Sequence, residues 1–273
     1  MTRALVLAGG GLAGIAWETG VLLGLRDAGV DLTAPDLVVG TSAGSAVGAA
    51  LLSGTDLEEL FARQVAQEHH ELTPEMDLQA LIAFFTEVGD FTKGVDEATR
   101  RTVGAYAREA TTVSLEARQE VMRWRLPSHD WPSTPLRLTA VDTETGALVV
   151  LDAASGVPLI DAVAASCAVP GVWPCVPLLG RLLMDGGVRS TTNLDLAEGY
   201  DDVVTLAPLT IGAMEQVVQT EADRLRAQGA TVRVICADEA SAAAFGPNPL
   251  DPASRPAAAE AGRVQGRAAA QLF

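Results

Sequence analysis

The residues best suited to chemistry lie in one short segment, Gly40-Thr41-Ser42-Ala43-Gly44, which has the form Gly-x-Ser-x-Gly. The apolar residues 37–39 predict a strand before this segment, and the small apolar residues 43–52 predict a buried helix after it. A serine at a sharp turn between a strand and a helix presents its hydroxyl for attack on an ester, and the helix N-terminus favours developing negative charge. Ser42 is therefore the candidate nucleophile.

A serine nucleophile needs a base, and the usual base is a histidine. The three histidines, His69, His70 and His129, all lie in the first half of the chain, whereas the Ser-Asp-His order of α/β-hydrolases needs a late one. Asp185 is the remaining candidate, because it follows an apolar strand predicted at 182–184 and precedes two glycines. Burial at that position raises the pKa of a carboxyl group and makes it a better base.

Three consecutive glycines, Gly9, Gly10 and Gly11, follow a strand predicted at 4–8. Glycine-rich backbone can direct N–H groups at an oxyanion, so these residues are the candidate oxyanion hole. With Gly14 they also match Gly-x-Gly-x-x-Gly, and the alternative function is a nucleotide- or phosphate-binding protein. That function requires an acidic residue at the end of the second strand, where this chain has Gly40-Thr41-Ser42 instead.

The elements expected around these motifs form an α/β pattern. Strands and helices alternate at 4–8, 14–28, 37–39 and 43–52, which is typical of a mostly parallel sheet covered on both faces. Further strands are expected at 136–141, 147–151, 182–184, 203–206 and 232–237, with helices at 159–168 and 214–228 and near the end of the chain. No repeat or linker is evident, so residues 1–273 are expected to form a single domain.

The segment 55–126 is expected to be mostly helical and is a candidate cover for the site. Its apolar side chains are equally suited to an acyl pocket and to the core, with core as the better expectation. They are Leu81, Ile82, Phe84 and Phe85.

Charge and composition exclude several classes of function. The net charge of −16 argues against nucleic-acid binding and weakens electrostatic docking on an anionic membrane. No apolar stretch reaches the ~20 residues that a membrane span requires. Three cysteines, in neither metal nor redox spacing, fit a reducing compartment. We therefore expect a cytoplasmic protein.

Taken together, the three motifs resemble those of the patatin-like phospholipase family: a glycine-rich loop, then Gly-x-Ser-x-Gly, then Asp-Gly-Gly. The segment 165–170 is also similar to the family's helix-to-loop segment ahead of the catalytic aspartate, and the resemblance covers about residues 5–193. One departure is that Leu12 and Ala13 stand where many members carry an arginine or lysine.

The resemblance implies a three-layer α/β/α fold and a Ser42–Asp185 dyad with no metal or cofactor. Gly9, Gly10 and Gly11 would form the oxyanion hole, and the substrate would be a lipid or another carboxylic ester. Transient contact with a membrane surface is compatible with such a substrate. A patatin-like protein that regulates or binds a partner without hydrolysis is the second alternative.

Overall fold

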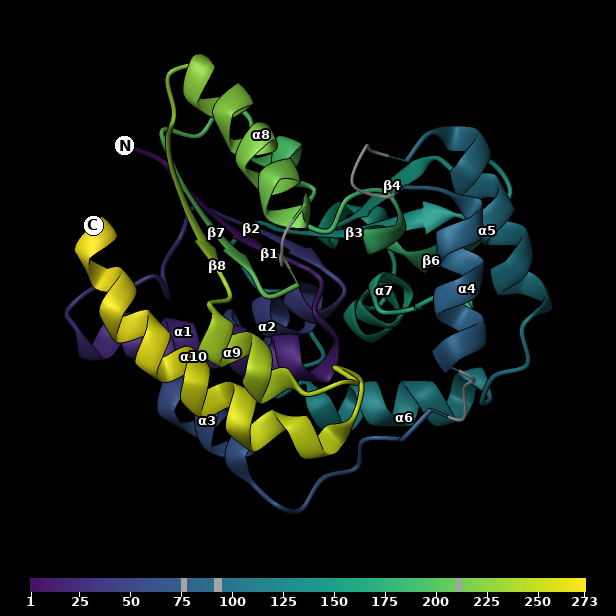
Figure 1. The fold of residues 1–273 in the computed structure, drawn as a ribbon, viewed down its shortest axis with the longest axis horizontal. Helices are drawn as coiled ribbons and strands as arrows, with labels where there is room; N and C mark the ends of the chain where they lie inside the picture. Colours follow the sequence, from purple (N-terminus) through teal and green to yellow (C-terminus); the bar gives the residue numbers. More distant parts are fainter. Residues whose placement is uncertain (75–77, 91–94, 210–212) are drawn as a thin grey trace.

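The centre of the molecule is a mixed β-sheet (Figure 1). The computed structural model describes residues 1–74, 78–90, 95–209 and 213–273. Within these residues the sheet has eight strands, in the order β5-β6-β3-β2-β1-β7-β8, with β4 paired to β3. The strands are β1 (Arg3–Leu7), β2 (Leu37–Thr41), β3 (Leu136–Asp142), β4 (Leu148–Leu151), β5 (Val176–Leu178), β6 (Arg181–Asp185), β7 (Asp202–Ala207) and β8 (Thr231–Cys236).

The strands from β3 to β8 along this order are parallel, whereas β4 and β6 each pair antiparallel with β3, and β5 pairs antiparallel with β6. The carboxyl ends of the parallel strands therefore lie together at one end of the sheet. Ligand sites in α/β sheets form at that end, because loops rather than strands continue there. Ser42 directly follows β2, and it lies at this end.

The sheet is buried on both faces, as the alternation of side chains in β1 shows. Leu5 and Leu7 pack into a core with α1, α2, α7 and α10. Ala4 and Val6 pack on the opposite face, in a core that α8 covers. The helices concerned are α1 (Gly11–Asp27), α2 (Ala43–Leu51), α7 (Leu159–Ser166), α8 (Ala213–Ala227) and α10 (Arg255–Ala269). Figure 1 shows α8 on one side of the sheet and α1, α2 and α10 on the other. The three-layer α/β/α prediction is thus confirmed.

Glycines allow α1 and α10 to pack with their backbones almost in contact. A Cβ atom on Gly20 would lie 2.1 Å from the carbonyl oxygen of Ala259, and one on Gly262 would lie 2.3 Å from that of Trp17. Gly24 and Gly266 make the same kind of approach one turn further along each helix. The last long helix is therefore fixed against the first, and α9 (Glu239–Phe245) packs beside it.

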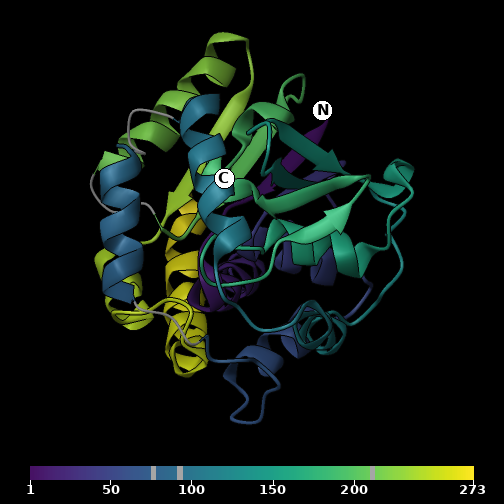
Figure 2. The ribbon, with the colours of Figure 1, turned by 90° about the vertical axis from the view of Figure 1, so that its right-hand side faces the viewer.

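The segment 55–126 is mostly helical, as expected. It contains α3 (Leu57–Val65), α4 (Leu78–Val88), α5 (Glu97–Glu109) and α6 (Leu115–Arg125). Figure 1 places α4 and α5 on one side of the molecule, next to β4 and β6, and Figure 2 views the molecule from that side. Phe84 of α4 stacks on Tyr106 of α5, with ring centroids 3.9 Å apart, so this side chain is part of the helix–helix packing.

Two elements differ from the sequence-based expectation. Helix α1 begins at Gly11 rather than near Gly14, and Pro208 and Pro249 pack so closely on its start that a side chain at position 10 or 11 would collide with them. Strand β5 lies in a segment expected to be a proline-rich loop, and it is a short edge strand in which proline is tolerated. None of the helices in the described part of the chain combines the length and apolarity needed to cross a bilayer.

Candidate active site

Ser42 occupies a strained turn between β2 and α2. Its φ of 51° and ψ of −112° are rare for a residue with a side chain, and such a conformation typically costs about 1–3 kcal/mol. The glycines on either side make the turn possible. A Cβ on Gly44 would lie 2.0 Å from the carbonyl oxygen of Leu7, and one on Gly40 would lie 2.7 Å from that of Gly44. The small residues of the motif are therefore a consequence of close backbone packing.

The backbone of Ser42 is held by residues from the end of α7. Its N–H donates to Ser166 Oγ at 3.0 Å. Its carbonyl oxygen accepts from Ser45 Oγ at 2.6 Å and from Cys167 Sγ at 3.1 Å. These polar contacts are buried, and they stabilise a backbone conformation that the chain would otherwise avoid.

Strand register brings Asp185 to the same end of the sheet. Thr41 pairs with Thr139 of β3, and the next residue of β3, Ala140, pairs with Asp185 of β6. Strand β4 pairs with Thr139 and Ala140 on the other side of β3, so β2 and β6 lie on the same side and their carboxyl ends meet there. A Cβ on Gly186 would lie 2.2 Å from Thr139 Oγ1, so the chain can pass this close to β3 because this residue is a glycine.

The carboxyl group of Asp185 is almost completely removed from solvent, with 4% of the residue exposed. Oδ1 accepts from the N–H of Gly187 at 2.7 Å. Among the described residues, Oδ2 has no hydrogen bond of good geometry. Burial raises the pKa of Asp185 from 3.8 to about 6, although the Ser42 hydroxyl and the Gly187 N–H partly oppose this rise. The group is therefore a carboxylate at neutral pH, with a basicity suited to accepting a proton.

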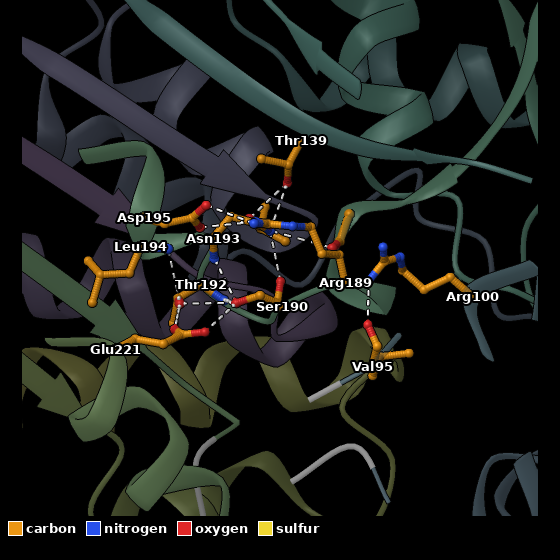
Figure 3. A network of polar contacts seen from close by, with 12 residues as sticks. Val95, Arg100, Thr139, Arg189, Ser190, Thr192, Asn193, Leu194, Asp195 and Glu221 are labelled. Carbon is orange, nitrogen blue, oxygen red and sulfur yellow. Dashed lines mark hydrogen bonds and ion pairs between the residues drawn. The ribbon is translucent and has the colours of Figure 1, made fainter. Parts of the chain in front are cut away.

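Asn193 fixes the loop that follows Asp185 (Figure 3). Its side-chain amide donates to Thr41 Oγ1 at 3.0 Å and to the carbonyl oxygen of Ser190 at 2.8 Å, with a longer bond to Thr139 Oγ1 at 3.3 Å. Arg189 in turn donates to Asn193 Oδ1 at 2.7 Å. One side chain thus connects β2, β3 and the Asp-Gly-Gly loop, which ties the position of Asp185 to that of Ser42.

The glycine-rich loop supplies fewer oxyanion donors than the sequence indicates. The N–H of Gly9 donates to the carbonyl oxygen of Thr191 at 2.9 Å, so Gly9 cannot also donate to an oxyanion. The expectation that Gly9 donates to the oxyanion is therefore corrected. Gly9 instead leaves space beside Ser42, because a Cβ on Gly9 would lie 3.5 Å from the Cβ of Ser42. The N–H groups of Gly10 and Gly11, at the start of α1, have no hydrogen-bond partner within the described part of the chain.

Sequence reasoning missed a third donor in this region. The N–H of Ala43 is the first of α2 and is likewise unpaired among the described residues. The residue after the nucleophile commonly contributes such a donor. Gly10, Gly11 and Ala43 therefore make up the candidate oxyanion hole, with two helix N-termini directed at it.

A cavity of about 380 Å³ opens over these residues. Ser42 and Asp185 both line it, and most of the other lining residues are apolar or glycine. They are Gly9, Gly10, Gly11, Phe85, Val169, Pro170, Gly187, Val188, Thr191, Leu209, Pro249 and Leu250. An apolar cavity of this size with a few polar groups at one end is suited to an acyl chain whose ester reaches Ser42.

Of the four apolar residues proposed for an acyl pocket, Phe85 alone lines this cavity. Leu81 and Ile82 line a separate open cleft on the outer side of α4, and Phe84 packs against α5. The ring of His129 contacts the carbonyl oxygen of Arg123 through Nε2. Among the described residues no group of histidines, cysteines and carboxylates is arranged to hold a metal ion.

No curated protein matches the chain. Among solved structures, VipD from Legionella pneumophila is 13% identical, with a TM-score of 0.48 over 99% of this chain and 67% of that one. The type III effector ExoU is also 13% identical, with a TM-score of 0.41 over 99% and 53%. ExoU in its complex with SpcU, from Pseudomonas aeruginosa, is 17% identical, with a TM-score of 0.40 over 99% and 52%.

This chain therefore spans about two thirds of VipD and about half of ExoU. The sequence model described as "Patatin-like phospholipase" matches residues 5–198, which include Ser42, Asp185 and the glycine-rich loop. Since this match covers more than half of the sequence, the chain belongs to the patatin-like phospholipase family.

Proposed function

We propose that the protein is a serine acyl hydrolase that cleaves carboxylic esters of lipids, in the manner of a phospholipase A, lysophospholipase or esterase. The observation that supports this most directly is the shared cavity. Ser42, in a strained strand-to-helix turn, and Asp185, with its raised pKa, line one apolar cavity beneath unpaired backbone N–H groups.

In the proposed reaction, Asp185 Oδ2 accepts the hydroxyl proton of Ser42 while Ser42 Oγ attacks the ester carbonyl carbon. The carbonyl oxygen becomes an oxyanion and is stabilised by the N–H groups of Gly10, Gly11 and Ala43. When the tetrahedral intermediate collapses, the bond to the alcohol oxygen breaks, and that oxygen takes the proton from Asp185. An acyl-Ser42 ester remains.

Water completes the reaction. Asp185 accepts a proton from a water molecule while the oxygen of that water attacks the acyl carbon. A second oxyanion then forms in the oxyanion hole. Collapse of this intermediate breaks the bond to Ser42 Oγ, which regains its proton from Asp185. The fatty acid leaves and the site returns to its starting state without a metal ion or cofactor.

The test is hydrolysis of p-nitrophenyl esters from acetate to palmitate by the wild type, Ser42→Ala and Asp185→Asn. We expect hydrolysis by the wild type only, with both variants folded. A fluorophosphonate probe should label the wild type and the control Ser133→Ala, whose side chain is exposed, but not Ser42→Ala. Activity that survives Ser42→Ala would refute the mechanism.

The same experiment separates the two alternatives. A protein that binds a nucleotide through the glycine-rich loop would be stabilised thermally by NAD or ATP and would hydrolyse nothing. A regulatory member of the family would hydrolyse nothing and leave Ser42 unlabelled. The apolar lining of the cavity favours a lipid over a nucleotide.

Transient contact with a membrane surface is also part of the proposal. It is supported by the open cleft on α4, where Ile82 is 51% exposed beside Phe85 of the site cavity. Co-sedimentation with zwitterionic vesicles should fall for Ile82→Ser. The cytoplasmic location stays a prediction, which cell fractionation tests.

A further inference from the structure

Arg118 of α6 carries a buried guanidinium group that the proposed reaction does not use. The residue is 4% exposed. Among the described residues its Nε has no hydrogen-bond partner, and its guanidinium makes no ion pair within 4.0 Å. One face of the group lies over the ring of Trp173, 3.9 Å from the centroid. A buried charge is normally paired, so an unpaired guanidinium calls for a functional explanation.

The neighbouring charges do not neutralise Arg118. The nearby carboxylate, Glu71, is bound by Arg125, which donates from Nε at 3.0 Å and from Nη2 at 2.5 Å. A third buried arginine, Arg255, donates to the carbonyl oxygen of Arg63 and leaves Nη1 unpaired. Three buried guanidinium groups thus surround one carboxylate. In a chain with a net charge of −16, this is a local excess of positive charge.

Arg118 lines a recess next to the nucleophile. The recess has a volume of about 20 Å³, and Ser42 and Trp173 also line it. It borders the main cavity, because Gly11, Ser42 and Leu250 line both. A space of this size holds one water molecule or one oxygen atom of a larger group. An anionic group lying in the main cavity could therefore place a single oxygen against Arg118.

Burial, with a further contribution from nearby Arg125, lowers the pKa of Arg118 to about 9. The guanidinium is therefore still charged at neutral pH, but at a cost that an anion would offset. Within the described part of the chain, the other carboxylate that interacts with Arg118 is that of Asp185, and the interaction lowers the pKa of Asp185. The position is thus electrostatically prepared for a further negative charge.

We propose that Arg118 determines substrate specificity by binding an anionic oxygen next to the scissile ester, and that a headgroup phosphate supplies this oxygen. This inference rests on the proposed hydrolase function and names the residue that recognises the charge. The carboxylate of a released fatty acid offers the same chemistry to Arg118, so the experiment has to distinguish headgroup phosphate from product carboxylate.

The kinetic test compares two short-chain lipids that differ only in the phosphate, dihexanoylphosphatidic acid and dihexanoylglycerol. At pH 8, where Asp185 is ionised and Arg118 is mostly charged, we expect the wild type to prefer the phosphate lipid. The ratio of the two kcat/KM values should fall about 10- to 100-fold in Arg118→Gln and less in Arg118→Lys. The control Arg123→Gln removes the same charge from the exposed side of α6 and should keep the wild-type ratio. An unchanged ratio in Arg118→Gln would overturn the inference.

A binding measurement makes the result independent of turnover. Ser42→Ala should bind dihexanoylphosphatidic acid at least tenfold more tightly than dihexanoylglycerol, and Ser42→Ala/Arg118→Gln should lose that difference. Equal affinities in Ser42→Ala would overturn the anion site even if the wild type hydrolyses esters. Conversely, preferential binding without any hydrolysis would support the anion site and refute the proposed function.

Two further measurements identify the ligand and exclude a structural role for Arg118. If the site serves the product carboxylate, hexanoate will inhibit more strongly than inorganic phosphate. Arg118→Gln will then weaken inhibition by hexanoate without altering the preference for the phosphate lipid. This result would overturn the assignment to headgroup phosphate. Arg118→Met, which replaces an unpaired buried charge with an apolar side chain, should raise Tm by about 2–4 °C. A fall in Tm would show that Arg118 stabilises the fold instead.

Discussion

Replacement of Asp185 by asparagine is predicted to make the protein more stable at neutral pH while it abolishes activity. In the folded protein, burial raises the pKa of Asp185 from 3.8 to about 6. Between these pH values the folded state binds more protons at this group than the unfolded state does. The free energy of unfolding therefore falls as pH rises through this window. Below about pH 4 the carboxyl group is neutral in both states, and the cost disappears.

The pKa values set the size of the effect. A rise from 3.8 to about 6 corresponds to about 3 kcal/mol of destabilisation once the group is ionised. Asparagine preserves the shape and can still accept from the N–H of Gly187, but it has no charge to desolvate. Asp185→Asn should therefore exceed the wild type by about 3 kcal/mol at pH 7, which is about 6–12 °C in Tm, and should match it near pH 4.

Activity should respond to the same ionisation in the opposite direction. Only the carboxylate can accept the Ser42 proton, so kcat/KM for a neutral ester should fall about tenfold per pH unit below pH 6. Loss of the base in Asp185→Asn should reduce kcat by about 10²–10⁴-fold. One buried carboxyl group is thus expected to decrease stability and support catalysis over the same pH range.

The assay combines thermal unfolding at pH 4 and pH 7 with p-nitrophenyl butyrate hydrolysis from pH 4.5 to pH 8. The control Asp130→Asn removes an exposed carboxylate and should change neither property. Two results would contradict the reasoning. One is a stability gain in Asp185→Asn that is the same at both pH values; the other is a kcat/KM profile that stays flat down to pH 4.5.

Three other perturbations test the packing and the hydrogen bonds around the site. Gly44→Ala should lower the free energy of unfolding in urea by about 3 kcal/mol or more, because its Cβ would lie 2.0 Å from the carbonyl oxygen of Leu7. In the control Gly89→Ala the nearest contact of the new Cβ is at 3.6 Å, and the free energy of unfolding should fall by less than 1 kcal/mol. Asn193→Ala removes the amide that donates to the hydroxyl of Thr41 and to the carbonyl of Ser190. It should lower the free energy of unfolding by about 2–4 kcal/mol and lower kcat more than it raises KM. A variant with wild-type kcat would show that Asn193 does not position the dyad. Glu18 is fully buried, and burial raises its pKa well above the usual range. The gain in free energy of unfolding from Glu18→Gln should therefore increase between pH 5 and pH 8. A gain that decreases as pH rises would contradict this prediction.

The parts of the fold that could be predicted from sequence are those with strong local patterns. Uninterrupted apolar strands and an all-apolar helix at 43–52 indicate burial on both faces, and both features are present. Gly-x-Ser-x-Gly could be placed between a strand and a helix because the patterns on either side change period at the motif. The start of α1 was placed too late, since the glycines that weaken local helix propensity are required by the proximity of two prolines distant in sequence.

Long-range geometry explains what the sequence could not show. The N–H of Gly9 is occupied by Thr191, which lies 182 residues later, and no local pattern signals that contact. The recess residue Arg118 is a charged residue in a helix rich in charged side chains, where an exposed position is expected, yet its side chain is buried against Trp173. The asparagine at position 193 follows the Asp-Gly-Gly motif closely enough to attract notice, but its partners in β2 and β3 become visible only in the folded chain.

Features that reduce stability are concentrated around Ser42. The serine has an unfavourable backbone conformation. Among the described residues, one oxygen of the proposed base Asp185 has no hydrogen bond, and the buried cation Arg118 has no ion-pair partner. The surrounding structure holds these groups in place through backbone contacts that only glycine permits, from Gly44 against β1 to Gly186 against β3. Two of these charges would be neutralised only when a substrate is bound and reacts: Asp185 by the proton of Ser42, and the Arg118 guanidinium by an anionic oxygen of the substrate. Because relief of this kind requires the ligand, the site resembles a preorganised catalytic centre more than a surface for binding a regulatory partner.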